Sequence, residues 1–374
     1  MAINKEQNKL NVPHLRFPEF QGEWEKCKLG DIAEFSTARV SSVKLDCKNY
    51  VSTENMLQDF QGVVEAKSVP NETNVISFTC GDILISNIRP YLKKVWKATF
   101  DGGCSSDVFV LQATDTVAKD YLHYAVANDK FINYVMSGAK GVKMPRGDKN
   151  QMRTYQLSLP SIQEQYKIAK LLTLLDERIA TQSKLIEKLE SLIKGLAHHC
   201  IRDFTNDCEY IRLGDISKIT TGKLDANAQV ENGQYPFFTC AERPFNIDSY
   251  AFDTEALLIS GNGANLGYIN YYKGKFNAYQ RTYVLDHFSV NIQYVKWALK
   301  VLLPQRIAIE KSSSNTPYIV LSTLADLKIP IPNNSKQNHI ANLMMSFEKK
   351  LSNQLALSDL YNKLKQYMLR QMFI

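Results

Sequence analysis

The sequence contains one unit written twice, and this duplication restricts the possible folds more than any other feature. Leu-Gly-Asp-Ile at residues 29–32 recurs at residues 213–216. Three further echoes follow in the same order: residues 83–86 with 257–260, 143–145 with 315–317, and 157–160 with 327–330. The spacing between partners drifts by a few residues, as expected for insertions in loops on a common scaffold. The sequence therefore predicts two equivalent units in one chain.

Each unit closes with a long predicted helix whose apolar residues repeat every seven positions. In the first helix the steps of four and three residues run without a break through Ile168, Leu172, Leu175, Ile179, Gln182, Ile186, Leu189, Ile193 and Leu196. In the second they run through Ile340, Leu343 or Met344, Phe347, Leu351, Gln354, Leu357, Tyr361, Leu364 and Met368. This is the seam of a coiled coil, so we expect the two helices to pack as an antiparallel pair. The alternative is that each helix only caps its own domain.

One polar residue stands at the same level of each seam. Gln354 follows Gln182 by 172 residues. A buried glutamine pair would hydrogen-bond in one register only, at some cost in stability. We therefore predict that Gln182 and Gln354 set the coiled-coil register. The first helix, at about 1.5 Å per residue, would also act as a spacer of about 50–55 Å between the two units.

The globular parts are predicted to be mixed α/β, so the fold class is α/β with two pseudo-symmetric recognition domains separated by two long helices. Apolar runs at residues 82–86 and 256–260 predict buried strands, and residues 121–135 and 292–303 have helical spacing. The predicted boundaries are 1–160 for the first domain, 161–203 for the central helix, 204–331 for the second domain and 332–374 for the C-terminal helix.

The composition restricts which cellular compartment and which class of partner fit this chain. Hydrophobic residues make up 44% and charged residues 22%, which excludes a disordered chain. We expect no signal peptide, since the first ten residues lack an apolar core, and no apolar run approaches membrane-spanning length. Seven scattered cysteines without a C-x-x-C pair fit a reducing cytoplasm. The net charge of +7 permits nucleic-acid binding without requiring it.

The distribution of the basic residues favours DNA. Residues 83–100, 130–147 and 256–285 carry lysines and arginines and no acidic residue. Such stretches suit a polyphosphate, because each neutralised phosphate releases counterions. Base reading needs Arg, Lys, Asn or Gln side chains in loops. The predicted DNA-binding residues are Arg89, Lys93, Lys94, Lys140, Lys143, Arg146 and Lys149 in the first domain, and Arg243, Asn262, Asn265, Lys273, Arg281, Lys311, Asn315 and Tyr318 in the second.

No pattern in the sequence predicts a catalytic or metal site. Residues 315–318, Asn-Thr-Pro-Tyr, differ by one residue from the Asn-Pro-Pro-Tyr motif of adenine-N6 methyltransferases, and the glycine-rich residues 261–267 lead into a predicted strand instead of a helix. Asp46 or Asp59 with residues 65–67 only weakly imitates a nuclease site. Residues 198–200 with Cys208 are better explained as a chance cluster than as metal ligands. There is no Walker loop.

The duplicated, ordered motifs resemble the specificity subunits of type I restriction-modification systems over essentially the whole chain. The resemblance rests on the two Leu-Gly-Asp-Ile motifs, on residues 160–169 leading into residues 174–179, and on the second copy at residues 332–341. The second copy departs at Lys336, since Lys336-Gln337 stands where the first copy has Glu-Gln, and at Phe347 and Glu348, where the first copy has Leu-Asp.

The resemblance implies a protein with no catalytic site of its own that reads a bipartite DNA sequence within a larger complex. Its partners would be double-stranded DNA, two modification subunits and, for cleavage, restriction subunits. S-adenosylmethionine, ATP and magnesium would be bound by those subunits. Two other functions remain open at this point: a free-standing adenine-N6 DNA methyltransferase, and a scaffold that binds proteins through its coiled coil.

Overall fold

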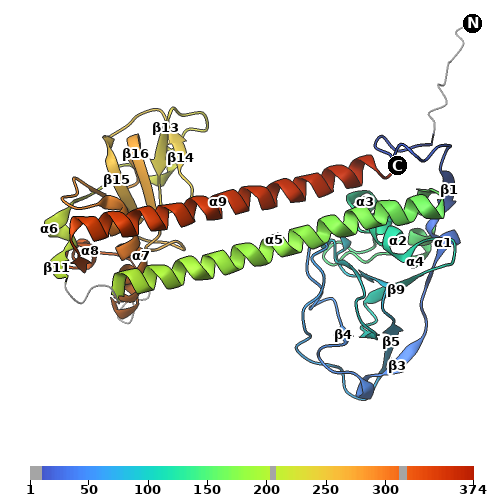
Figure 1. Ribbon diagram of the computed structural model, residues 1–374. Coiled ribbons are helices and arrows are strands. Elements are labelled where there is room, and N and C mark those ends of the chain that lie inside the picture. The colour runs from blue at the N-terminus through green and yellow to red at the C-terminus, as the bar shows by residue number, and fades with distance from the viewer. Residues whose placement is uncertain (1–10, 203–207, 311–317) are drawn as a thin grey trace, which may run out of the picture. The chain divides into compact units, whose positions relative to one another are not determined.

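The computed structural model describes residues 11–202, 208–310 and 318–374, and the chain forms two compact units (Figure 1). Unit 1 comprises residues 1–182 and 357–374, and unit 2 comprises residues 183–356. Each unit therefore contains one globular domain and one part of each long helix. In the part of the chain that is described, no helix is both long enough and apolar enough to cross a membrane.

Unit 1 is built on two small four-stranded sheets and one two-stranded sheet. The strand orders are β2-β9-β6-β7, β3-β5-β8-β4 and β1-β10. The strands are β1 (Glu25–Lys28), β2 (Ala33–Phe35), β3 (Arg39–Ser41), β4 (Tyr50–Val51), β5 (Asn74–Phe78), β6 (Ile83–Ser86), β7 (Val95–Lys97), β8 (Gly102–Cys104), β9 (Val108–Ala113) and β10 (Gln156–Leu159). The helices are α1 (Leu29–Ile32), α2 (Lys119–Val126), α3 (Asp129–Ser137) and α4 (Lys149–Arg153).

The predicted strand at residues 82–86 is confirmed, and it lies at the centre of the main core. The helix expected over residues 121–135 is two helices, α2 and α3. The break has a local cause, because the Asn128 side chain accepts a hydrogen bond from the Phe131 amide and so caps a new helix.

Unit 2 is built on one six-stranded sheet, in the order β12-β17-β15-β16-β13-β14, and the two-stranded sheet β11-β18. Both predicted elements are confirmed, residues 256–260 as the end of β15 and residues 292–303 within α7. The strands are β11 (Glu209–Arg212), β12 (Lys218–Thr221), β13 (Tyr235–Phe238), β14 (Phe245–Ile247), β15 (Phe252–Ser260), β16 (Ile269–Ala278), β17 (Thr282–Asp286) and β18 (Lys328–Ile331). The helices are α6 (Leu213–Ile216), α7 (Ile292–Glu310) and α8 (Leu321–Ala325).

The repeat is visible in the pairing of the strands that open and close each domain. In unit 1, Glu25 pairs with Leu159, and in unit 2, Glu209 pairs with Ile331. Residues 157–160 therefore correspond to residues 329–332. The sequence alignment of 157–160 with 327–330 was wrong by two residues, because two apolar-Pro segments were matched by type without the strand register.

The Leu-Gly-Asp-Ile motif is a single helical turn that joins the two-stranded sheet of each domain to a larger one, between β1 and β2 in unit 1 and between β11 and β12 in unit 2. Leu29 and Leu213 are fully buried. A side chain on Gly30 would approach the Arg153 side chain to 3.1 Å, and one on Gly214 would approach Ala325 to 3.3 Å. Glycine is needed here because α1 and α6 pack closely against α4 and α8.

The long helices α5 (Ile162–Arg202) and α9 (Asn334–Gln371) pack against each other within both units (Figure 1). In unit 1, Asp176 pairs with Lys365 at 2.6 Å, and the Arg178 guanidinium donates to the Tyr361 hydroxyl at 3.2 Å. Because the residue number rises along one helix as it falls along the other, the helices are antiparallel. All nine seam positions of α5 are buried or half-buried, which confirms the heptad prediction for that helix.

The seam of α9 departs from the prediction near its C-terminus. Leu364 is 38% exposed, whereas Lys365, Leu369 and Met372 face the partner helix and the core. The expected seam position was wrong because the globular domain of unit 1, and not only α5, covers the end of α9. The Phe373 ring, for example, stacks on Tyr121 with ring centroids 5.2 Å apart.

An acidic residue at the same position of each long helix fastens that helix to the neighbouring domain. Asp176 accepts a hydrogen bond from the Tyr124 hydroxyl of α2 at 2.8 Å. Glu348 pairs with Lys296 and Lys300 of α7 at 2.6 and 2.9 Å. The change from Leu-Asp to Phe347 and Glu348 therefore keeps the acid and changes only its partners.

Candidate nucleic-acid interface

Two segments distant in the sequence of unit 1 lie side by side and bring the predicted basic residues together. The Gly147 amide donates to the Asn87 carbonyl at 3.0 Å, and the Arg89 amide donates to the Pro145 carbonyl at 2.8 Å. Lys140 and Arg146 also exchange backbone hydrogen bonds at 3.1 and 2.9 Å. The turn after β6 and residues 138–147 thus form one loop cluster, which we call the unit 1 loop cluster.

The turn after β6 is held in an uncommon backbone conformation. Arg89 and Lys93 have φ angles of 49° and 54°, and a 3-10 turn, Pro90–Leu92, lies between them. Asp59 and Phe60, with φ angles of 52° and 62°, donate their amides to the Leu92 and Lys93 carbonyls. Non-glycine residues in this region cost about 1–3 kcal/mol each and concentrate at functional sites. Tyr91, which is 48% exposed within this turn, was missed by the sequence analysis.

The stretches that carry no acid in the sequence do meet acids in space. Lys93 pairs with Asp129 at 2.8 Å, Arg146 with Asp107 at 2.8 Å, and Lys140 with Asp148 at 3.6 Å. The expectation of a cation surface cleared of acids was therefore wrong for these residues, since Asp129 and Asp107 come from other segments of the fold and Asp148 directly follows the acid-free stretch at residues 130–147. Arg89 and Lys143 are exposed and have no ion pair with any residue the structure describes.

Two of the predicted lysines are partly withdrawn from solvent. The Lys149 ammonium lies over the rings of Phe109 and Phe35, 4.7 and 5.5 Å from their centroids, and burial lowers its pKa. Lys149 was expected in a flexible loop but is the first residue of α4, which Asp148 caps. The Lys94 ammonium donates to the Thr53 carbonyl at 2.6 Å, and burial lowers its pKa as well.

Unit 2 repeats the same pairing of segments. The Ile319 amide donates to the Gly261 carbonyl at 2.9 Å, which matches the bond from Gly147 to Asn87 in unit 1. Tyr283 adds a hydrogen bond from its hydroxyl to the Ile319 carbonyl at 2.8 Å. We call residues 240–243, 261–268, 279–281 and 318–320 the unit 2 loop cluster.

Several predicted residues meet in the unit 2 loop cluster. Arg281 accepts a hydrogen bond at its carbonyl from Gly261 at 2.8 Å, and its side chain is exposed. The Asn262 amide oxygen accepts from the Cys240 thiol at 2.9 Å, and the Asn265 amide donates to the Cys240 carbonyl at 3.1 Å. Arg243 is exposed, and Tyr318 is 55% exposed.

The remaining predicted residues lie elsewhere. Lys273 is in the middle of β16, paired with Glu255 of β15 at 3.4 Å, and so does not share the turn. Lys311 and Asn315 lie outside the described residues, as does most of the Asn-Thr-Pro-Tyr motif. Gln182 is 3% exposed and Gln354 is half-buried, and their role in register stays a prediction.

The cysteines and the possible metal-binding side chains were also compared. Among the described residues, no two cysteines are joined by a disulfide. Within residues 11–202, 208–310 and 318–374 there is no group of three metal-binding side chains. The glycine-rich turn after β15 leads into β16, as expected, so it does not open a helix.

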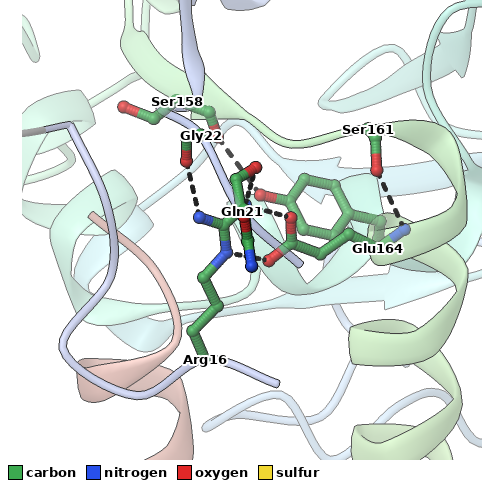
Figure 2. A network of polar contacts seen from close by, with 7 residues as sticks. Arg16, Gln21, Gly22, Ser158, Ser161 and Glu164 are labelled. Atoms are coloured by element: carbon green, nitrogen blue, oxygen red, sulfur yellow. Dashed lines mark hydrogen bonds and ion pairs between the residues drawn. The ribbon is translucent and has the colours of Figure 1, made fainter. Parts of the chain in front are cut away.

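The sequence analysis also missed a clamp at the start of α5. The Arg16 guanidinium makes two 2.8 Å hydrogen bonds to the Glu164 carboxylate and further bonds to the Gly22 and Gln21 carbonyls at 2.5 and 3.2 Å (Figure 2). Glu164 is 1% exposed, and it raises the pKa of Arg16 through this hydrogen bond. The clamp holds the N-terminal segment against the helix. Its only sequence signal was a glutamate in the motif at residues 160–169.

The fold and the paired loop clusters define a class of protein that presents two equivalent recognition surfaces from two repeated domains sharing one helix pair. The chain belongs to the family described as type I restriction modification DNA specificity domain, whose model matches residues 21–191 and 205–358. The two matches follow the internal repeat.

Individual relatives cover different shares of the chain. The type I restriction enzyme EcoDI specificity subunit of Escherichia coli is 44% identical over 135 residues, 36% of this chain and 30% of that protein. The MjaVIII specificity subunit of Methanocaldococcus jannaschii is 25% identical over 263 residues, 62% of this chain and 58% of that protein. A putative type I specificity subunit of Mycoplasma pneumoniae, S.MpnORF638P, is 24% identical over 82% of this chain and 84% of its own length. The matched region thus spans less than two thirds of the first two relatives.

Two solved structures share the fold. The S subunit of a type I restriction-modification system from M. genitalium superposes with a TM-score of 0.69 at 17% identity, covering 97% of this chain and 99% of that one. A chain from a study of complex assembly and conformational transition of the type I R-M system has a TM-score of 0.58 at 19% identity, covering 92% and 96%.

Proposed function

We propose that this chain is the sequence-specific DNA recognition subunit of a type I restriction-modification complex. Each domain reads one half of a bipartite target, and the paired helices set the spacing between the halves. The observation that carries the proposal is the repeated contact between segments, from Gly147 to Asn87 and from Ile319 to Gly261, which builds an equivalent loop cluster in each unit. Two equivalent surfaces in one chain suit a target with two half-sites.

Within the loop clusters we assign DNA contacts according to whether each charged side chain is exposed or held in an ion pair. Arg89 and Lys143 in unit 1, and Arg243 and Arg281 in unit 2, are exposed and suit direct contact with phosphates or guanine edges. Asn262, Asn265 and Tyr318 supply amide groups and an aromatic ring beside them. The ion-paired Lys93, Lys140, Arg146 and Lys273 contribute less, because DNA phosphates must displace a carboxylate. The proposed set of DNA-binding residues is completed by Lys94, Lys149, Lys311 and Asn315.

The chain acts as a non-catalytic subunit in this proposal. Two modification subunits supply S-adenosylmethionine and methyl transfer, and restriction subunits supply ATP- and magnesium-dependent cleavage. The strand that follows the glycine-rich turn supports this division, since a cofactor turn of a methyltransferase leads into a helix. We place the complex in the reducing cytoplasm, in keeping with seven scattered cysteines that include no C-x-x-C pair.

The test uses the purified chain with and without its modification subunits. A pool of random duplex DNA is incubated with the complex, and bound sequences are selected; we expect two short conserved blocks separated by a fixed spacer. A radiolabelled methyl donor is then added to DNA carrying the selected site. Methyl transfer only in the presence of the modification subunits supports the proposal. Transfer by the chain alone would instead indicate a free-standing adenine-N6 methyltransferase. A scaffold would select no sequence and would show no steep dependence of DNA binding on salt.

A further inference from the structure

The start of α5 and the end of α9 in unit 1 are covered by residues 11–20, a segment without helix or strand. The Leu15 amide donates to the Gln371 carbonyl at 3.0 Å, and Leu15 and Phe17 pack against the core of unit 1. Arg16 is clamped by Glu164, as described above (Figure 2). Lys167 pairs with Glu19 and lies over the Phe17 ring, 4.6 Å from its centroid.

The equivalent surface of unit 2, at the start of α9 and the end of α5, is an open groove. Its volume is about 420 Å³. It is lined by Leu196, His199, Cys200, Pro332, Ser335, Lys336, His339, Ile340 and Leu343.

The groove is equivalent to the covered surface residue by residue, at a separation of 172 positions. On the starting helix, Pro332, Lys336 and His339 stand where unit 1 has Pro160, Glu164 and Lys167. On the ending helix, Leu196, His199 and Cys200 stand where unit 1 has Met368, Gln371 and Met372. The buried residues beneath agree as well: Ile168, Ala169 and Leu172 with Leu369 and Met372 in unit 1, and Ile340, Ala341 and Met344 with Ala197 and Cys200 in unit 2.

Among the residues of unit 2 that the structure describes, no segment corresponds to residues 11–20 of unit 1. In unit 1, residues 11–20 precede β1 in the sequence and belong to neither long helix. In unit 2, β11 begins at Glu209, and the helix that precedes it is α5 itself, which ends at Arg202 and forms one wall of the groove.

The charge of the groove is reversed relative to unit 1. Glu164, which receives Arg16, is replaced by Lys336, and Lys336 is exposed whereas Glu164 is buried. None of the nine lining residues is acidic, and His199 and His339 are among them. An occupant with an arginine at the position of Arg16 would meet a like charge, whereas an acidic side chain would meet an opposite one.

We propose that this groove binds an extended segment of a partner protein that carries an aliphatic or aromatic anchor next to an acidic residue. The anchor packs between Leu196 and Leu343, and the acid pairs with Lys336. The segment lies as residues 11–20 lie in unit 1, with its charge inverted. This site belongs to the helix pair and is separate from the loop clusters, so it does not depend on the proposed DNA binding.

The test uses the chain's own segment as the probe, because its fit to the equivalent surface is known. Two fluorescent peptides of residues 11–22 are titrated into the full-length chain, one unaltered and one with Arg16→Glu. Anisotropy is measured with the wild-type chain and with a Lys336→Glu variant, which changes only an exposed side chain. We expect the Arg16→Glu peptide to bind the wild-type chain at least tenfold more tightly than the unaltered peptide. The order should reverse in Lys336→Glu.

A second variant locates the binding. Ser335→Trp, at an exposed position of the groove, should fill it and abolish binding of the Arg16→Glu peptide without loss of helix content by circular dichroism. Failure of both peptides to bind at millimolar concentration would overturn the proposal. Equal affinities of the two peptides that do not change in Lys336→Glu would overturn it as well. Tighter binding of the unaltered peptide to the wild-type chain would also overturn it, in favour of the N-terminal segment of a second copy of this chain.

Discussion

Gln165 and Gln337 make the same pair of hydrogen bonds at the start of the two long helices. The Gln165 amide donates to the Pro160 carbonyl at 2.9 Å and accepts from the Ala118 amide at 2.9 Å. The Gln337 amide donates to the Pro332 carbonyl at 2.8 Å and accepts from the Asn291 amide at 3.0 Å. Both side chains are at most 2% exposed. This glutamine therefore joins each long helix to the start of α2 or α7, which explains why it persists where the preceding Glu164 changes to Lys336.

Removing either glutamine should destabilise its own unit. Gln165→Ala or Gln337→Ala leaves a buried amide and a buried carbonyl without partners, at a cost of about 1–3 kcal/mol in the free energy of unfolding. Urea unfolding followed by circular dichroism measures the loss, and hydrogen exchange assigns it to one unit. Gln163→Ala, at an exposed position on the same helix, is the matched control. Equal stability of the control and the Gln165 variant would refute this role.

In the unit 1 loop cluster, we predict opposite effects on DNA binding when a cation is removed and when a nearby acid is neutralised. Lys143→Ala should weaken DNA binding and flatten the dependence of log K on log salt by about 0.9, the contribution of one phosphate contact. Asp107→Asn should tighten binding and steepen the slope, because it frees Arg146 from its 2.8 Å ion pair. Binding is measured by anisotropy at several salt concentrations. Lys188→Ala, an exposed lysine of α5, should leave the slope unchanged, and an equal effect of all three variants would exclude a specific role for the cluster.

The stability of unit 1 should depend on pH through His123. Burial lowers the pKa of His123 from 6.5 to about 4, and the charges of Lys365 and Lys97 also lower it, against Asp176 and Asp120. Its Nδ1 atom is buried with no hydrogen-bond partner in the described structure. The unfolded chain binds this proton more readily, so stability is full above pH 6.5 and falls as the pH drops to 4, by about 3 kcal/mol.

Urea unfolding at pH values from 4 to 7 tests this dependence. His123→Gln should remove most of the slope between pH 6.5 and 4. His14→Gln, an exposed histidine of the N-terminal segment, should leave the slope as it is in the wild-type chain. If the slope survives His123→Gln, other groups are responsible for the acid sensitivity.

The proposed spacing role of the helices predicts a change of target when their length changes. One heptad is about 10.5 Å of helix, which corresponds to about three base pairs of duplex DNA. Removing one matched heptad from both α5 and α9 should shorten the selected spacer by about three base pairs and leave both half-sequences as they are. Selection from random DNA with the modification subunits present measures both quantities. Loss of a half-sequence with an unchanged spacer would contradict the proposed spacing role of the helices.

The sequence by itself determined the repeat, the helix pair and the strands at the centre of each domain. These features depend on local periodicity: a step of four and three residues puts Ile168, Leu172 and Leu189 on one helix face whatever surrounds it. The Leu-Gly-Asp-Ile motif was visible in the sequence as an exact repeat, whereas its helical turn and the close contact of its glycine came from the structure.

Only the tertiary structure decided which of these residues are free to act. Asp129 and Asp107 neutralise Lys93 and Arg146 from segments that are remote in the sequence, so a run without acids did not guarantee an open cation surface. The tertiary structure also decided that the surface around Glu164 is covered and that the equivalent groove at Lys336 is open. Both follow the same motif, but their burial and charge pairing depend on the segment that the fold brings against them, and among the described residues such a segment is present only in unit 1.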